Sequence, residues 1–352
     1  MLFAPPQLPR TLAAALRDAI DKSPEVRRSA LRDLTRHHQG GDEGGADEVR
    51  GQVETALLEA LEDESPAVRG EAAEQLGACR VGAALPALLA AIEDPHVVVR
   101  QMAIAALGDI GDSRAIGRLE RALSDERPEL RYQATMALPR IAPGDAEAYF
   151  VKALADTDPG VRHIALRVAE ETFLSPDAPA GGRAALPEAV RARARALVDD
   201  EACNVRLAAA LLLAAAADRS GEAVLLEVVN QAPEDVEPDD EGAAVEAMGT
   251  LGIRAAIPAL RSRAFGMGRL LRERFSFLAL VSLARLGDPQ AEAKILGDLS
   301  AWSREKRTLA VIAAGRGNVG SALPKLQALR AAADVEDRAV FDDAIALLTP
   351  AG

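Results

Sequence analysis

The feature that most constrains this chain is a frame of residues that returns every 31 positions. In each copy an aspartate is followed five positions later by an aliphatic residue, and then immediately by an arginine. The aliphatic residues of the four evenly spaced copies are Val68, Val99, Leu130 and Val161. A period of this length is the signature of a repeat protein, in which each unit buries its apolar face only against its neighbours. The frame therefore predicts one array of stacked repeats and not two or three globular domains.

Two further copies of the frame keep its inner spacing but stand farther from the regular four. One begins at Asp21 and the other at Asp200, and their aliphatic residues lie 42 and 44 residues from the nearest regular copy. Both intervals contain stretches rich in residues that break helices. We therefore expect insert loops near 39–46 and 175–182 in an otherwise regular array.

The apolar residues between the frames follow a helical period. In the unit that begins at Asp94 they recur at intervals of three and four, as Val99, Met102, Ala103, Ala106, Leu107 and Ile110. This spacing places one apolar stripe along one face of a helix. Aromatic residues make up only 3% of the chain, and its many small and aliphatic residues suit helix packing better than strands. We predict an all-α fold with about ten helix–turn–helix units between Thr11 and Leu348.

One sequence pattern carries a family resemblance. Asp63–Gly77 reads Asp-x-x-Pro-x-Val-Arg-x-x-Ala followed by Ala-x-x-Leu-Gly, and Asp94–Gly108 repeats it with the proline displaced. This pattern resembles the HEAT repeat in its short bacterial form. The resemblance implies a right-handed α-solenoid in which charged side chains of successive repeats form a ladder. The expected structural ladder consists of Asp63, Arg69, Asp94, Arg100, Asp125, Arg131, Asp156 and Arg162.

The strength of the pattern divides the chain into three regions. Residues 1–10 predict an irregular N-terminal tail, residues 11–217 hold the regular HEAT repeats, and residues 218–352 hold degenerate ones. In the degenerate region we expect an acidic loop at 234–241. We align its ladder positions with Ala243 and Ala279.

The net charge argues against two classes of partner. The formal charge is −13, from 41 basic and 54 acidic residues, so the field of the molecule repels phosphate backbones and anionic membranes. We therefore expect no nucleic-acid partner and no membrane partner. No segment approaches the roughly 18 uninterrupted apolar residues of a membrane span, and the first residues do not resemble a signal peptide. These observations favour a cytoplasmic protein.

Residues that could carry catalysis or hold a metal are few and scattered. The chain has four histidines, and none stands four positions from another or in a His-Glu pair. Cys79 and Cys203 lie far apart in sequence, each inside a helical apolar pattern. Neither set has the spacing of a zinc site, a disulfide framework or an activated nucleophile. We therefore expect no metal, no cofactor and no enzymatic activity.

The leading functional interpretation is a non-catalytic scaffold or adaptor, whose concave surface binds another protein or a peptide. This step is an analogy with the fold. Two alternatives stay open because HEAT-like repeats also build other proteins: a bilin lyase or isomerase subunit, and, with less support, a DNA-binding or DNA-repair protein. A DNA-binding groove would be basic and aromatic, which the net charge and the single tryptophan disfavour.

The first candidate surface is a row on the second helices of the central repeats. On a helical wheel, we place the ladder aliphatic residue at 0°. The residues two and six positions later then point at about 200° and 240°, opposite the buried stripe. We expect them to face solvent on the concave side, where tyrosine, methionine and arginine favour protein binding. They are Gln101, Ala105, Tyr132, Met136, His163 and Arg167.

The second candidate surface is a basic stretch within the acidic chain. Glu273 is the only acid between residues 254 and 274. An acidic or phosphorylated segment of a partner protein would suit this stretch, as would the acidic loop of the same chain. A solvated helix face with intramolecular salt bridges is an equal alternative. Its arginines are Arg254, Arg261, Arg263, Arg269, Arg272 and Arg274.

Overall fold

The described residues of a computed structural model form twenty α-helices and no strand. They are residues 10–40, 46–175, 185–231, 236–266 and 275–349. The all-α prediction and the expected number of about ten helix pairs are therefore confirmed. The chain divides into two compact units, residues 1–190 and 191–352, and the boundary falls inside helix α11 (Glu188–Leu197).

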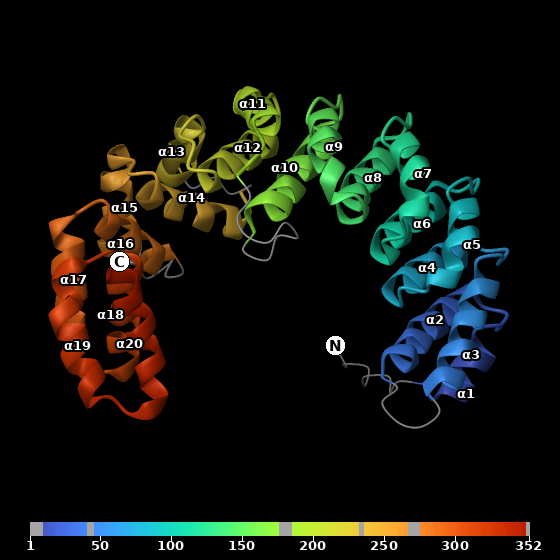
Figure 1. Cartoon of the computed structure of the whole chain (residues 1–352), viewed down its shortest axis with the longest axis horizontal. Helices are drawn as coiled ribbons and strands as arrows, with labels where there is room; N and C mark the ends of the chain where they lie inside the picture. The colour runs from blue at the N-terminus through green and yellow to red at the C-terminus, as the bar shows by residue number, and fades with distance from the viewer. Residues whose placement is uncertain (1–9, 41–45, 176–184, 232–235, 267–274, 350–352) are drawn as a thin grey trace, which may run out of the picture. The chain divides into compact units, whose positions relative to one another are not determined.

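In the first unit the helices alternate between two layers (Figure 1). The first helices of the pairs are α1 (Leu12–Asp18), α3 (Ala46–Ala60), α5 (Leu85–Ala91), α7 (Ile116–Ala122) and α9 (Ala146–Ala153). The second helices are α2 (Pro24–Gln39), α4 (Pro66–Ala78), α6 (Val97–Ile110), α8 (Pro128–Ile141) and α10 (Pro159–Leu174). Each second helix packs on its own first helix, and α2, α4, α6, α8 and α10 pack on one another in that order. We call these sets the first-helix layer and the second-helix layer.

The second unit repeats the same alternation. One layer contains α12 (Cys203–Ala215), α14 (Pro238–Thr250), α16 (Ser276–Arg285), α18 (Arg304–Arg316) and α20 (Val335–Leu348). The other contains α13 (Glu222–Gln231), α15 (Ile257–Phe265), α17 (Pro289–Asp298) and α19 (Leu323–Ala332). Short 3₁₀ turns lead into several helices of the first-helix layers: Gly82–Ala84, Ser113–Ala115, Pro143–Asp145, Arg254–Ala256 and Gly320–Ala322.

The frame found in the sequence sets where the second helices begin. The Oδ1 atom of Asp63 accepts a hydrogen bond of 2.8 Å from the backbone N–H of Ser65, which folds the chain into a tight turn. Pro66 then occupies the first helical position, where its missing N–H costs nothing. Asp156 makes the same 2.8 Å bond to the backbone of Asp158, ahead of Pro159. In these repeats the acid and the proline therefore start the second helix at a fixed point.

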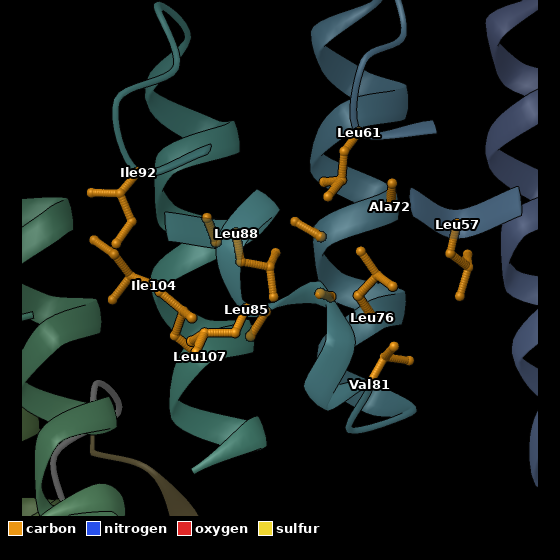
Figure 2. Close-up of a cluster of buried hydrophobic side chains, with 14 of the residues drawn as sticks. Leu57, Leu61, Ala72, Leu76, Val81, Leu85, Leu88, Ile92, Ile104 and Leu107 are labelled. Atoms are coloured by element: carbon orange, nitrogen blue, oxygen red, sulfur yellow. The ribbon is translucent and has the colours of Figure 1, made fainter. Parts of the chain in front are cut away.

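The apolar stripes meet between the two layers and between successive pairs. Figure 2 shows Leu85 and Leu88 of α5 facing Ile104 and Leu107 of α6, and all four side chains are at most 2% exposed. One continuous cluster of buried residues extends from Ala15 of α1 to Tyr149 of α9. No pair closes its own core, so each repeat depends on its neighbours for burial.

Glycines allow the second helices to approach each other very closely. A Cβ atom placed on Gly77 would lie 2.7 Å from Cα of Ala106 in the next second helix. A Cβ atom on Gly108 would lie 2.7 Å from Cβ of Ala137. Such distances are too short for two carbon atoms, so only hydrogen fits at these positions. The Leu-Gly pair of the repeat is thus a packing element of the second-helix layer.

The same glycine contact corrects the alignment in the second unit. A Cβ atom on Gly249 of α14 would lie 2.6 Å from Cα of Ser282 in α16, so Gly249 corresponds to Gly77 and Ser282 to Ala106. The ladder positions of α14 therefore fall on Asp240 and Glu241, and not on Ala243. Those of α16 fall on Phe275 and Ser276, and not on Ala279.

Two expected loops differ from the structure at their ends. The acidic loop at 234–241 is helical in its second half, because α14 begins at Pro238. Proline at the first helical position and acidic residues in the first turn both favour a helix start. Residues 232–235 lie outside the described residues, as do 41–45 and 176–184 of the two insert loops. The outer residues of the loop at 39–46 belong to α2 and α3.

Two helical glycines should respond to alanine in opposite directions. Gly51→Ala should raise the free energy of unfolding by about 0.5–1 kcal/mol, because its Cβ would meet nothing within 4 Å and alanine favours the helix. Gly108→Ala should lower it by about 1–3 kcal/mol, because its Cβ would force α6 and α8 apart. Urea unfolding followed by circular dichroism measures both, and stabilisation by Gly108→Ala would contradict the packing role of Gly108.

Candidate functional site

The regular repeats are joined by a bidentate ion pair. Arg69 Nε and Nη2 donate to the two carboxylate oxygens of Asp94 in the next repeat, at 2.8 and 3.0 Å. Its Nη1 atom donates to the backbone carbonyl oxygen of Asp63 in its own repeat, at 2.8 Å. One guanidinium therefore ties the turn of its own repeat to the turn of the next. Parallel bonds of this kind are among the stronger hydrogen bonds in proteins.

The second complete rung joins Arg131 to Asp156, with both bonds at 2.7 Å. Arg27 reaches Asp63 at 2.7 Å across the insert that separates the first two copies of the frame. Arg162 keeps the bond within its own repeat, to the backbone carbonyl of Asp156 at 2.8 Å. The ladder thus spans the regular repeats but is not uniform.

The rung expected between Arg100 and Asp125 is absent from the described structure. Arg100 Nη1 donates to the carbonyl oxygen of Asp94 at 2.6 Å, as in the other repeats. Its Nε and Nη2 atoms are buried, and neither has a hydrogen-bond partner among the described atoms. The expected ladder is therefore wrong at this step, and nothing in the structure explains the open rung.

The ladder shifts the acidity of its carboxyl groups. Burial raises the pKa of Asp94, but the hydrogen bonds from Arg69 and from the His96 backbone more than offset this, so that the pKa lies below its usual value. Burial likewise raises the pKa of Asp156, and the bonds from Arg131 and the Asp158 backbone lower it further than burial raises it. Both acids stabilise the fold in their charged form.

The predicted row on the second helices is only partly exposed. Its members face solvent only in part, since all of them are half-buried: Gln101, Ala105, Tyr132, Met136, His163 and Arg167. Neighbouring second helices pack on both sides of each helix, which widens the buried face. Ile104 and Gly108 belong to that face, although they lie outside the stripe counted from Val99.

The half-exposed face includes three further residues that the sequence did not single out. Met102, Gln133 and Ile164 occupy equivalent positions on α6, α8 and α10 and have the same intermediate exposure. Nine residues occupy these three positions on the three helices, and only one of them, Arg167 on α10, is Asp, Glu, Lys or Arg, in a chain in which 27% of residues are. We call the other eight the central band: Gln101, Met102, Ala105, Tyr132, Gln133, Met136, His163 and Ile164.

Charged pairs border the central band. At its C-terminal edge Arg140 of α8 bonds Asp109 of α6 at 2.9 Å. On the preceding second helices the carboxylate of Glu71, 5% exposed, accepts from Arg32 at 2.7 Å and from Arg28 at 3.2 Å. The layer therefore changes from ion-paired side chains on α2 and α4 to a mostly uncharged band on α6, α8 and α10, with charged residues such as Arg140 and Arg167 beside it.

The basic stretch does not form a free patch in the described residues. Arg261 binds Asp288, which is 2% exposed, at 2.6 Å. Arg263 bonds Glu241 at 2.6 Å and the carbonyl oxygen of Val229 at 2.9 Å. Arg254 donates to the carbonyl oxygen of Leu286 at 3.4 Å. Intramolecular bonds thus engage these three arginines, as in the alternative of a helix face with intramolecular salt bridges, and their role in binding a partner stays a prediction. Arg269, Arg272 and Arg274 lie outside the described residues.

The Arg263–Glu241 bond is a charge-inverted rung. Glu241 occupies the position that arginine has in the regular repeats, and Arg263 supplies the opposite charge from α15. Both side chains are largely buried, at 13% and 11% exposure. The sequence-based alignment missed this rung because it lay three residues out of register. The expected pairing of the basic stretch with the acidic segment of the same chain is realised at this one bond.

The described residues contain no group of three or more His, Cys, Asp or Glu side chains that could hold a metal ion. No helix in this part of the chain is both long enough and apolar enough to cross a membrane.

Comparison with known proteins supports the repeat architecture. A family model of HEAT repeats matches residues 54–127. YibA of Escherichia coli is similar in fold, with a TM-score of 0.56 and 18% identity over 79% of this chain and 93% of YibA. An engineered protein has a TM-score of 0.51 and 17% identity over 97% of this chain and 99% of its own. No curated protein matches by sequence.

A longer solved structure has a similar fold over part of its length. Kap95p, whose binding induces the switch loops of RanGDP to adopt the GTP-bound conformation, has a TM-score of 0.52 at 15% identity. The match covers 96% of this chain and 50% of Kap95p. Likeness at such identities shows the fold alone.

The complete rung at Arg131 and the incomplete rung at Arg100 should contribute differently to the free energy of unfolding. Arg131→Gln should lower the free energy of unfolding by about 2–4 kcal/mol, because it leaves the Asp156 carboxylate largely buried without its bidentate partner. Arg100→Gln should cost clearly less, because Arg100 makes only the carbonyl bond. Urea unfolding of the two variants tests this, and equal losses would contradict the open rung.

The ladder acids should make stability depend on pH. Because the pKa of Asp156 is lower in the folded state, its contribution is present above the unfolded pKa of about 3.9 and is lost as pH falls through the folded pKa. Asp156→Asn should therefore be less stable than the native chain at neutral pH, and the difference should shrink below about pH 4. Asp47→Asn, at a fully exposed acid, is the control. A difference that stays constant on acidification would refute the assignment.

Proposed function

Since this chain is a HEAT-repeat protein, we propose that it is a non-catalytic scaffold or adaptor that binds another protein through the central band. One observation carries the proposal: of the nine half-exposed residues at three equivalent positions on three successive second helices, all but Arg167 lack a formal charge, in an otherwise strongly charged chain. They recur at the 31-residue period, so the stacking of repeats brings them onto one continuous face.

The residues of the band suit protein recognition. Met102 and Met136 are flexible and polarisable, and Tyr132 combines a large apolar ring with a hydroxyl group. Interface centres are depleted in charge and enriched in such side chains, while charged residues gather at their rims. The Arg140–Asp109 pair supplies a rim of this kind on one edge. Val98, at the start of α6 and 43% exposed, adds apolar area to the surface.

The partner that fits this face presents an uncharged, largely apolar strip. A carboxylate or ammonium group placed on the band would lose its hydration without gaining a counter-charge, which disfavours a charged strip. Kap95p offers a comparison, because it has a similar fold over part of its length and binds RanGDP. The bilin lyase alternative rests on the family resemblance alone, and no feature of the band favours it.

A matched pair of alanine substitutions tests the proposal. Ala105 lies within the band on α6, and Ala90 is exposed on α5 in the other layer. Ala105→Glu should reduce the recovery of the partner by about tenfold or more, because it places a charge inside the uncharged surface. Ala90→Glu should leave recovery unchanged. Affinity purification from the native cell, with quantitative mass spectrometry of the captured proteins, measures both.

The two variants should share the circular dichroism spectrum and melting temperature of the native chain, since glutamate is a good helix former. Met136→Glu repeats the test on α8. If every captured protein is recovered equally with Ala105→Glu, Met136→Glu and the native chain, the central band is not the binding surface.

A further inference from the structure

A groove lies between the first two members of the first-helix layer. Helix α1 has only 7 residues against 15 in α3, so it leaves part of α3 uncovered. The groove has a volume of about 840 Å³, and apolar side chains line its floor. They come from both helices: Leu16, Ala19, Ala56 and Ala60. Its size is that of a ligand or peptide site.

An exposed isoleucine stands at the mouth of this groove. Ile20 is 81% exposed and lines the groove directly after α1. The equivalent position, one residue before the ladder acid, is Glu62, Glu93 and Ser124 in the next three repeats and the small Ala155 in the fourth. The first repeat thus departs from the others by placing a large apolar side chain in water next to an apolar floor. Such an arrangement marks a surface that another molecule covers.

The rim of the groove is acidic. Five carboxylates line it, and the only basic lining residue is Arg27, which is 8% exposed and already bonded to Asp63. The carboxylate of Glu64 is 87% exposed. Glu48 and Glu59, both exposed, project from α3 along the groove. The full acidic lining is Asp21, Glu48, Glu59, Asp63 and Glu64.

We propose that this groove binds a basic amphipathic helix of a partner protein. The apolar stripe of such a helix would cover Ile20 and Leu16, and its lysine or arginine side chains would reach the carboxylates of the rim. A helix laid along α3 would extend the first-helix layer by ordinary helix packing. An acidic partner segment would be repelled. This site is distinct from the central band, which lies on the second-helix layer of later repeats.

Three synthetic peptides of about 18 residues, or five helical turns, serve as probes. The first combines a leucine stripe with arginines, the second has the same stripe with glutamates, and the third has the arginines with glutamine in place of leucine. Binding of each labelled peptide to the full chain is followed by fluorescence anisotropy. The leucine–arginine peptide should bind most tightly, and its binding should weaken as salt is added.

A glycine pair provides the matched variants. A Cβ on Gly51, which lines the groove, would meet nothing within 4 Å, and the same holds for Gly117 on α7. Gly51→Phe should fill the groove without disturbing the fold and weaken binding by about tenfold or more. Gly117→Phe should bind like the native chain. Equal binding by both variants, or by the peptide without leucines, would overturn the proposal.

A triple glutamine variant tests the charge of the rim. Replacing Glu48, Glu59 and Glu64 by Gln should weaken binding of the leucine–arginine peptide and reduce its salt dependence. The control replaces Glu126, Glu129 and Glu147, which are exposed on other repeats. A glutamate peptide that binds as tightly as the arginine peptide would refute the proposal. So would self-association of the native chain, seen by sedimentation and abolished by Gly51→Phe, because a second copy would then occupy the groove.

Discussion

The structure depends on how closely one second helix can approach the next. At Gly77 and Gly108 the neighbouring backbone lies where a side chain would begin, so a hydrogen atom is all the space allows. This contact sets the separation between successive repeats, and that separation decides whether the leucines of adjacent pairs interlock without voids. It also brings Arg69 and Arg131 within reach of the aspartate in the next repeat. The apolar core and the ion pairs are therefore consequences of the same close packing.

Most of the fold could be predicted because the same residue pattern recurs in several repeats. Asp63, Pro66 and Gly77 each have a local reason to be where they are, a turn, a helix start and a close contact, and all three recur with one period. Helices α14 and α16 of the second unit were harder to align because Glu241 and Ser276 stand where the regular repeats have the ladder arginine. The register of these two helices became visible only through Gly249, because the backbone of α16 packs directly against it.

The candidate surfaces could be predicted less well, for a physical reason. A helical wheel describes one helix alone, and the exposure of Tyr132 or Met136 depends on the helices packed to either side. The bonds of the basic stretch were hidden for a related reason, since Arg261 and Arg263 pair with acids that are distant in sequence. The groove beside α1 gave no sequence signal except the isoleucine at position 20, where the next three repeats carry Glu62, Glu93 and Ser124.

The open rung at Arg100 has a mechanical consequence. In an array of repeats, the resistance to bending at the joint between two neighbouring repeats depends on the contacts that those repeats make with each other. Between the repeats that contain α6 and α8 one bidentate ion pair is missing, while the glycine contact at Gly108 remains as a pivot. This joint therefore resists bending less than those fastened by Arg69 or Arg131. The central band crosses it, so the surface proposed for recognition can adjust its curvature to the molecule it holds.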